Sequence, residues 1–121
     1  MLENEKKINT SINNARMEFE KTRRTLENII LQRQMHEAEI NEIDEALKEL
    51  DKIDEKSKVY QNIGVILVEK DKEETKQLLL DKKVLLTTLT KNLRRQEKEL
   101  REKLRDLEEK INIYSKTSSP T

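Results

Sequence analysis

The stretch "KVYQNIGVILVEKD", residues 58–71, contains the only glycine of this 121-residue chain and its longest apolar run. Residues 59–63 follow the alternating pattern of a strand, and residues 65–68 are all apolar. Gly64 lies between these two runs, and glycine adopts the positive φ angles of a tight turn at little cost. The stretch therefore predicts a β-hairpin over residues 57–70.

The composition of the whole chain argues against a compact globular core. Charged residues make up 41% of the chain and apolar residues 33%, with one glycine and one proline. High charge with low hydrophobicity is typical either of disorder or of long helices and coiled coils. The two alternatives differ in periodicity, because only the helical chain needs a regular apolar stripe.

The first half of the chain carries such a stripe. Its positions alternate steps of four and three residues, which is the seam of a coiled coil: Ile8, Ile12, Ala15, Phe19, Thr22, Leu26, Ile29, Arg33, His36, Ile40, Ile43, Leu47 and Leu50. Thr22, Arg33 and His36 are polar, and polar seam residues usually lower stability. We therefore predict a helix over residues 1–56 that is weakest in its middle.

The second half repeats the pattern over a predicted helix at residues 71–115, followed by a flexible tail at 116–121. Asp71 can cap this helix, with Glu74 three residues further on. Apolar residues recur every seven positions: Leu79, Leu86, Leu93, Leu100, Leu107 and Tyr114. The intermediate seam positions are Leu89 and Gln96 early but Leu104 and Ile111 late, which predicts a change of frame between Leu100 and Leu104.

Two seams of similar length joined by a short connector predict a single, mainly α domain: an antiparallel two-helix coiled coil joined by the hairpin. A two-stranded hairpin alone is marginal in water, and this chain has nothing left to cover it. We therefore expect it to form part of a sheet shared between chains. The predicted assembly residues are Val59, Tyr60, Ile63, Gly64, Val65, Ile66, Leu67 and Val68.

The segment "VYQNIGVILVEKDKEE", residues 59–74, resembles the β-type subunits of the prefoldin family. The matching positions are Val59, Tyr60, Gly64, Leu67, Val68, Asp71, Glu73 and Glu74. Val65 departs from the family pattern, in which a second small or turn-forming residue is common. One hairpin rather than two indicates a β-type subunit and not an α-type subunit.

This resemblance implies a molecular chaperone that works without ATP or any other cofactor. Family members form a hexamer of two α-type and four β-type subunits, in which the hairpins build an intersubunit β-barrel. The tips of the coiled coils hold unfolded polypeptides and deliver them to a group II chaperonin.

The two ends of the chain have low charge, which fits a role in binding such clients. Only Arg16 is charged between residues 8 and 17, and only Lys116 between residues 111 and 121. Loosely held apolar side chains suit weak, promiscuous contacts. The predicted client-binding residues are Ile8, Ile12, Met17, Ile111, Ile113 and Tyr114. Ordinary frayed helix ends are the alternative interpretation.

Charge and motifs argue against other function classes. Lysine plus arginine and aspartate plus glutamate each total 25, so no net charge attracts nucleic acid. The chain has no cysteine, no apolar run of membrane-spanning length, and too few glycines for a phosphate-binding loop. His36 has no partners at metal-ligand spacing. We expect a cytoplasmic protein that is not an enzyme; a structural coiled-coil spacer, oligomerised by its hairpin, is the alternative to a chaperone.

Overall fold

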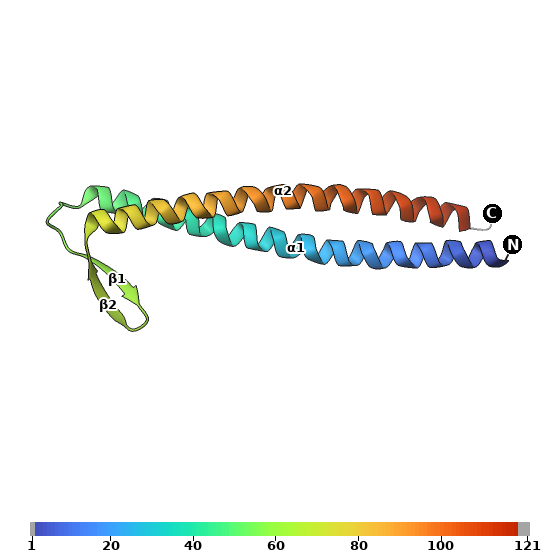
Figure 1. Ribbon diagram of the computed structural model, residues 1–121, viewed down its shortest axis with the longest axis horizontal. Helices are drawn as coiled ribbons and strands as arrows, with labels where there is room; N and C mark the ends of the chain where they lie inside the picture. The colour runs from blue at the N-terminus through green and yellow to red at the C-terminus, as the bar shows by residue number, and fades with distance from the viewer. Residues whose placement is uncertain (1, 119–121) are drawn as a thin grey trace. The chain divides into compact units, whose positions relative to one another are not determined.

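The computed structural model describes residues 2–118, which form two long helices and one hairpin (Figure 1). In chain order these are α1 (Leu2–Lys52), β1 (Val59–Ile63), β2 (Ile66–Lys70) and α2 (Lys72–Ser118). The two strands form an antiparallel two-stranded sheet. The predicted mainly α fold, with two helices and an intervening hairpin, is confirmed.

The element bounds differ from the predicted ones at two places. Helix α1 ends at Lys52 rather than at residue 56, because the chain turns at Asp54, whose carbonyl accepts the N–H of Ser57 at 2.9 Å. Helix α2 continues to Ser118, so residues 116–118 are helical where the sequence predicts a tail. The rest of that predicted tail, 119–121, lies outside the described residues.

The described residues fall into two compact units. The terminal unit contains residues 2–32 and 93–118, and the hairpin unit contains residues 33–92. In the terminal unit the two helix segments run antiparallel, and their buried side chains include Ile12, Ala15, Leu26 and Leu93. The Nζ atom of Lys103 on α2 lies 2.8 Å from a carboxylate oxygen of Glu18 on α1.

Ion pairs show the antiparallel register of α1 and α2 in the hairpin unit. Asp44 of α1 pairs with Lys83 of α2 at an N–O distance of 2.6 Å, and Asp51, two turns further along α1, pairs with Lys76, two turns earlier in α2, at 3.2 Å. Glu39 also pairs with Lys82, at 2.6 Å. Ile43, Leu50 and Leu86 are buried between these pairs. Lys72 donates to the carbonyl of Ile53 at 3.1 Å and so caps the end of α1 with a cation.

The start of α2 has the predicted cap. The Asp71 carboxylate accepts the backbone N–H of Glu74 at 3.1 Å, and the Asp71 carbonyl accepts the N–H of Thr75 at 2.9 Å. Glu73 and Glu74 place negative charge in the first turn, where the helix dipole favours it. The short sequence signal therefore locates this helix start to within one residue.

The seam of α1 is as predicted, and the seam of α2 is as predicted except at Leu89 and Gln96. All thirteen α1 positions of the predicted seam are buried or half-buried. From residue 79 to residue 114 of α2, the buried and half-buried residues follow one unbroken series of four-residue and three-residue steps: Leu79, Lys83, Leu86, Thr90, Leu93, Glu97, Leu100, Leu104, Leu107, Ile111 and Tyr114.

The predicted frame change in α2 is therefore wrong. Leu89 and Gln96 are exposed, while Thr90 and Glu97 occupy the seam positions next to them. Apolar character favoured Leu89 over Thr90 in the sequence, but the uninterrupted heptad spacing decides which side chain faces the partner helix. Leu89 instead lies with the exposed residues Leu78 and Leu85 on another side of α2.

The hairpin turn is the two-residue sequence Gly64-Val65, between the paired residues Ile63 and Ile66. Gly64 has a φ of +60°, and no other described residue has a positive φ. A turn with positive φ only at its first central position has the pattern of type II′, which requires glycine there and accepts an ordinary residue next to it. Val65 is therefore compatible with the turn.

Candidate functional site

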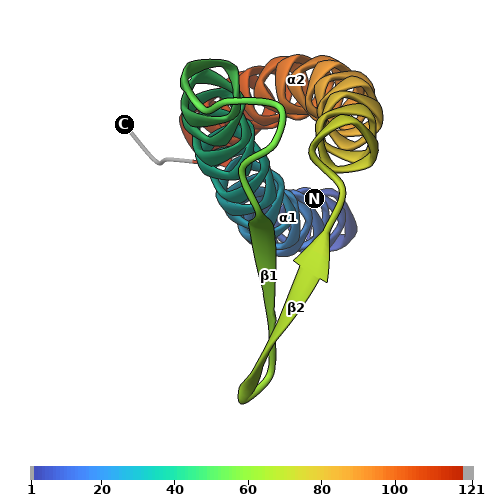
Figure 2. The ribbon, with the colours of Figure 1, turned by 90° about the vertical axis from the view of Figure 1, so that its left-hand side faces the viewer.

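The hairpin exposes apolar side chains on both faces of its sheet. The cross-strand pairs run from Val59 opposite Lys70 to Ile63 opposite Ile66. Because side chains alternate along a strand, one face carries Val59, Gln61, Ile63, Ile66, Val68 and Lys70, and the other carries Tyr60, Asn62, Leu67 and Glu69. Figure 2 shows the hairpin projecting to one side of the helices to which it is joined.

Most of the predicted assembly residues are exposed in the single chain. Only Val59 and Val68, on the strand halves nearest the helices, are half-buried. The exposed large apolar side chains of the hairpin are Tyr60, Ile63, Val65, Ile66 and Leu67. A two-stranded sheet that is apolar on both faces and open at both edges is a surface for pairing with another chain.

The predicted client-binding residues all lie in the terminal unit, but their exposure differs. Met17 and Ile113 are strongly exposed, at 71% and 62%. Ile8, Ile111 and Tyr114 are half-buried. Ile12 is only 6% exposed and is a core residue of the helix pair, so it offers little surface to a ligand.

Two features of this end were missed by the sequence reasoning. Leu2 is 71% exposed and adds apolar surface near the start of α1. It lies outside the low-charge segments of the sequence because its neighbours Glu3 and Glu5 are charged. The ammonium group of Lys110 lies 5.8 Å from the centroid of the Tyr114 ring. This cation–π contact holds one face of the tyrosine against its own helix.

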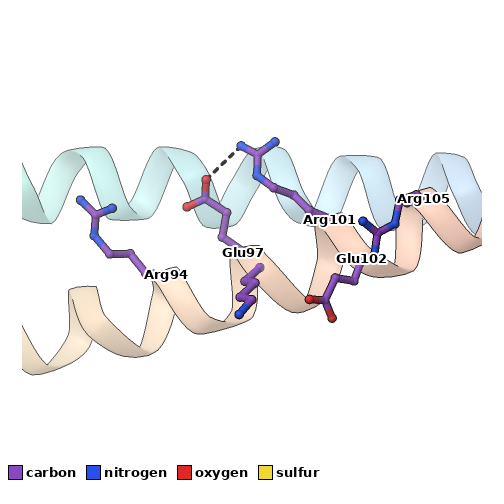
Figure 3. Close-up of a pocket in the computed structure, with 6 residues that line it drawn as sticks. Arg94, Glu97, Arg101, Glu102 and Arg105 are labelled. Atoms are coloured by element: carbon purple, nitrogen blue, oxygen red, sulfur yellow. Dashed lines mark hydrogen bonds and ion pairs between the residues drawn. The ribbon is translucent and has the colours of Figure 1, made fainter.

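A charged groove of about 340 Å³ lies along α2 in the terminal unit. Six side chains of this one helix line it: Arg94, Glu97, Lys98, Arg101, Glu102 and Arg105 (Figure 3). Arg101 donates to the Glu97 carboxylate at 3.0 Å, one helical turn away. Because all six lining side chains are charged and belong to a single helix, the groove is a solvated helix face and no enclosed reaction site.

Ion pairs shift the pKa of two carboxyl groups in the terminal unit. The hydrogen bond from Lys103, together with its positive charge, lowers the pKa of Glu18. The hydrogen bond from Arg23 likewise lowers the pKa of Glu20, and that carboxylate in turn raises the pKa of Arg23. These groups lie partly exposed on the helix surface and do not form a reactive centre.

The described residues 2–118 offer neither a metal site nor a membrane span. This range contains no group of three or more histidine, cysteine, aspartate or glutamate side chains placed to hold a metal ion. Within the same range, neither helix has a stretch apolar enough to cross a membrane.

These features define a class of protein: a two-helix coiled-coil subunit with an exposed hairpin for association. Residues 13–118 match the family of prefoldin subunits. The prefoldin subunit beta of Pyrobaculum islandicum is 38% identical over 94 residues, which cover 78% of this chain and 75% of that protein. The prefoldin subunit beta of Archaeoglobus fulgidus is 33% identical over 100 residues, covering 83% and 86%.

A solved structure gives the same result. The crystal structure of the prefoldin beta subunit from Thermococcus strain KS-1 superposes with a TM-score of 0.75 at 26% identity, covering 91% of this chain and 94% of that one. The chain belongs to the prefoldin subunit family, and the resemblance drawn from residues 59–74 is confirmed.

Proposed function

We propose that this chain is the β-type subunit of a prefoldin chaperone, which holds unfolded polypeptides without ATP and passes them to a group II chaperonin in the cytoplasm. The observation that carries this proposal is the exposure of apolar side chains at both functional regions of a prefoldin fold. The hairpin exposes Ile66 and Leu67, and the terminal unit exposes Met17 and Ile113.

Assembly is the role of the hairpin. Its free edges and apolar faces suit pairing with other prefoldin hairpins in a closed β-barrel, which leaves no edge unpaired. The family pattern supports a hexamer in which four such chains join two α-type subunits. Fully burying one large apolar side chain of the hairpin contributes about 1.5–3 kcal/mol, so several together can hold subunits in place.

Client capture is the role of the terminal unit. Met17 and Ile113 are exposed apolar side chains with polar neighbours. The methionine side chain is flexible and adapts to different surfaces, so this arrangement suits weak contacts with many sequences. Several copies in one hexamer multiply such weak affinities. Ile8, Ile111 and Tyr114 add partly exposed apolar surface beside them.

A structural coiled-coil spacer is the competing function, and membership of the prefoldin family disfavours it. The two functions differ in what the terminal unit binds. A spacer binds nothing there or one defined partner, whereas a chaperone binds many unfolded chains.

The test is suppression of aggregation. The purified chain is mixed with an α-type prefoldin subunit, and light scattering of a chemically denatured test protein is followed on dilution, without nucleotide. We expect scattering to fall as the complex is added and to reach a minimum near equimolar complex. Unchanged scattering with an assembled complex would contradict the chaperone function and favour the spacer.

A further inference from the structure

The charged groove on α2 in the terminal unit is lined by more cations than carboxylates. Its cations follow one another at steps of four, three and four residues, so they lie along one face of the helix: Arg94, Lys98, Arg101 and Arg105. All four are exposed, and together they form what we call the basic stripe. The stripe spans about 17 Å of the helix, at 1.5 Å per residue.

The two carboxylates of the groove do not neutralise the stripe. Glu97 lies at a seam position, its side chain is only 13% exposed, and it accepts a hydrogen bond from Arg101 at 3.0 Å. Figure 3 shows this ion pair as the only one among the six lining side chains, so Glu102 pairs with neither Lys98 nor Arg105. The groove therefore presents a net positive charge to the solvent.

The stripe lowers the stability of its own helix. Residues three or four positions apart are neighbours on a helix surface, so each cation of the stripe lies beside the next, and like charges at these spacings repel one another. An anion that binds between the cations relieves this repulsion. The electrostatics of this surface therefore improve with an anionic partner.

The zero net charge of the chain conceals an uneven distribution of charge. The terminal unit, residues 2–32 and 93–118, has 14 lysine and arginine residues against 11 aspartate and glutamate residues, a net charge of +3. The hairpin unit, residues 33–92, has 11 against 14, a net charge of −3. The positive unit is the one proposed to hold clients.

We propose that the basic stripe binds acidic segments of unfolded client polypeptides, while the exposed apolar side chains of the same unit bind their apolar segments. Arginine clusters recognise acidic motifs through charge-assisted hydrogen bonds. Ile113 lies eight residues beyond Arg105 on the same helix, about 12 Å along its axis, so one client can contact both surfaces. This inference rests on the proposed function and names the class of client that it favours.

The spacing of the stripe fits an extended polypeptide. Steps of three and four residues separate the cations by about 4.5 and 6 Å along the helix axis. Side chains on one face of an extended chain are about 6.6 Å apart, so carboxylates at alternate residues can meet successive cations, whose side chains are long and flexible. The six lining residues include no aromatic side chain on which a base could stack, which favours a polypeptide over a single-stranded nucleic acid.

Paired peptides and paired variants test the stripe in the complex of this chain with an α-type prefoldin subunit. The acidic probe is a short fluorescent peptide with one apolar segment and one segment of alternating glutamate and serine, and in the matched probe glutamine replaces glutamate. The variant Lys98→Gln with Arg105→Gln removes half of the stripe. Arg95→Gln with Lys21→Gln is the control, because it removes the same charge from exposed positions of the same unit and leaves the stripe intact.

We expect the wild-type complex to bind the acidic peptide at least fivefold more tightly than the glutamine peptide at low salt, measured by fluorescence anisotropy. The stripe variant should lose at least threefold in affinity for the acidic peptide, whereas the control variant should change less than twofold. Roughly 0.5 M salt should remove the preference, because it screens exposed charges. Glutamine is a good helix former, so circular dichroism should show unchanged helical content in both variants.

The remaining outcomes overturn the inference. If the wild-type complex suppresses aggregation of the denatured test protein but binds both peptides equally, the stripe selects no acidic clients, and the proposed function stands. If the stripe and control variants lose the same affinity, the net charge of the unit acts and not the stripe. If a single-stranded oligonucleotide displaces the acidic peptide and binds more tightly, the stripe is a nucleic-acid surface. If the wild-type complex neither suppresses aggregation nor binds either peptide, the proposed function itself fails, and this inference falls with it.

Discussion

At the scale of single residues, the buried hydroxyl of Thr90 is the clearest feature that lowers the stability of the fold. Its side chain is 8% exposed, and its hydroxyl oxygen has no hydrogen-bond partner among the described residues. A buried polar group without a partner costs about 1–3 kcal/mol, whereas an apolar group of the same shape costs nothing of this kind. Thr90 therefore occupies the coiled-coil seam in spite of its chemistry.

Thr90→Val should stabilise the chain. The substitution keeps the branched shape and removes the unpaired hydroxyl, so we expect the free energy of unfolding to rise by about 1–2 kcal/mol. Urea denaturation followed by circular dichroism measures this. Thr88→Val is the control, because Thr88 is exposed and its hydroxyl already donates to the Val84 carbonyl at 3.1 Å. Equal stability of the Thr90 variant and the wild type would show that the hydroxyl has a partner in solution.

The Glu18–Lys103 pair predicts a pH dependence at the same scale. Lys103 lowers the pKa of Glu18 in the folded chain, so the pair contributes stability above the usual carboxyl pKa, and this contribution is lost as the pH falls through the lowered value. Glu18→Gln should therefore lower the thermal midpoint slightly at neutral pH and leave it unchanged in strong acid.

Salt provides the control for this prediction. The pair is partly exposed, so roughly 1 M salt should screen it and reduce the difference between Glu18→Gln and the wild type at neutral pH. A difference that persists in acid would mean that the side chain of Glu18 acts by packing and not by charge.

At the scale of elements, the hairpin leaves large apolar side chains uncovered in the single chain. Ile66 and Leu67 are adjacent, so they point to opposite faces of the sheet, and both are exposed in the single chain. Ile66→Asp or Leu67→Asp should leave the helical content nearly unchanged but abolish assembly with an α-type subunit, because each would bury an unpaired charge. Analytical ultracentrifugation measures both the free chain and the complex. Survival of the complex with either variant would exclude that face from the interface.

The elements also show what the sequence could and could not predict. The hairpin, its glycine turn and the Asp71 cap depend on local chemistry within a few residues, so a short stretch was sufficient to predict them. One intermediate position of the α2 seam was predicted wrongly because local apolarity favoured Leu89, while the real seam uses Thr90. Which side chain is buried depends on the facing helix, and a single sequence carries that information only weakly.

The candidate site was predictable to a similar degree. Low charge correctly pointed to Met17 and Ile113 as exposed apolar residues, but the same criterion included Ile12, which the helix pair buries. Ile12 is at once a seam position and a member of a low-charge segment, and packing decides between these roles. The exposure of Leu78 and Leu85 was not predicted, because each directly precedes a seam leucine in the sequence.

At the scale of the whole molecule, the proposed client binding requires exposed apolar side chains in the terminal unit, whereas stability requires buried ones. Met17 and Ile113 are strongly exposed, so their apolar surface is available for binding. Ile12 is buried in the core between the helices, so it has little surface available for binding. A substitution at either kind of position lowers apolar area, but only the exposed positions should change binding without changing folding.

The double variant Met17→Ser with Ile113→Ser should therefore reduce client holding while sparing both stability and assembly. We expect at least a threefold higher concentration of complex for half-suppression of aggregation, a partial loss because several subunits share one client and avidity supports the rest. Ile12→Ala should behave in the opposite way: a cost of about 2–5 kcal/mol in folding, as for other buried aliphatic truncations, with holding little changed at temperatures where the chain stays folded. Aggregation of a denatured test protein and thermal unfolding, measured side by side on the same complexes, separate the two effects. If the double variant protects the client as well as the wild type does, the exposed side chains of the terminal unit are not the binding surface, and the spacer function gains support.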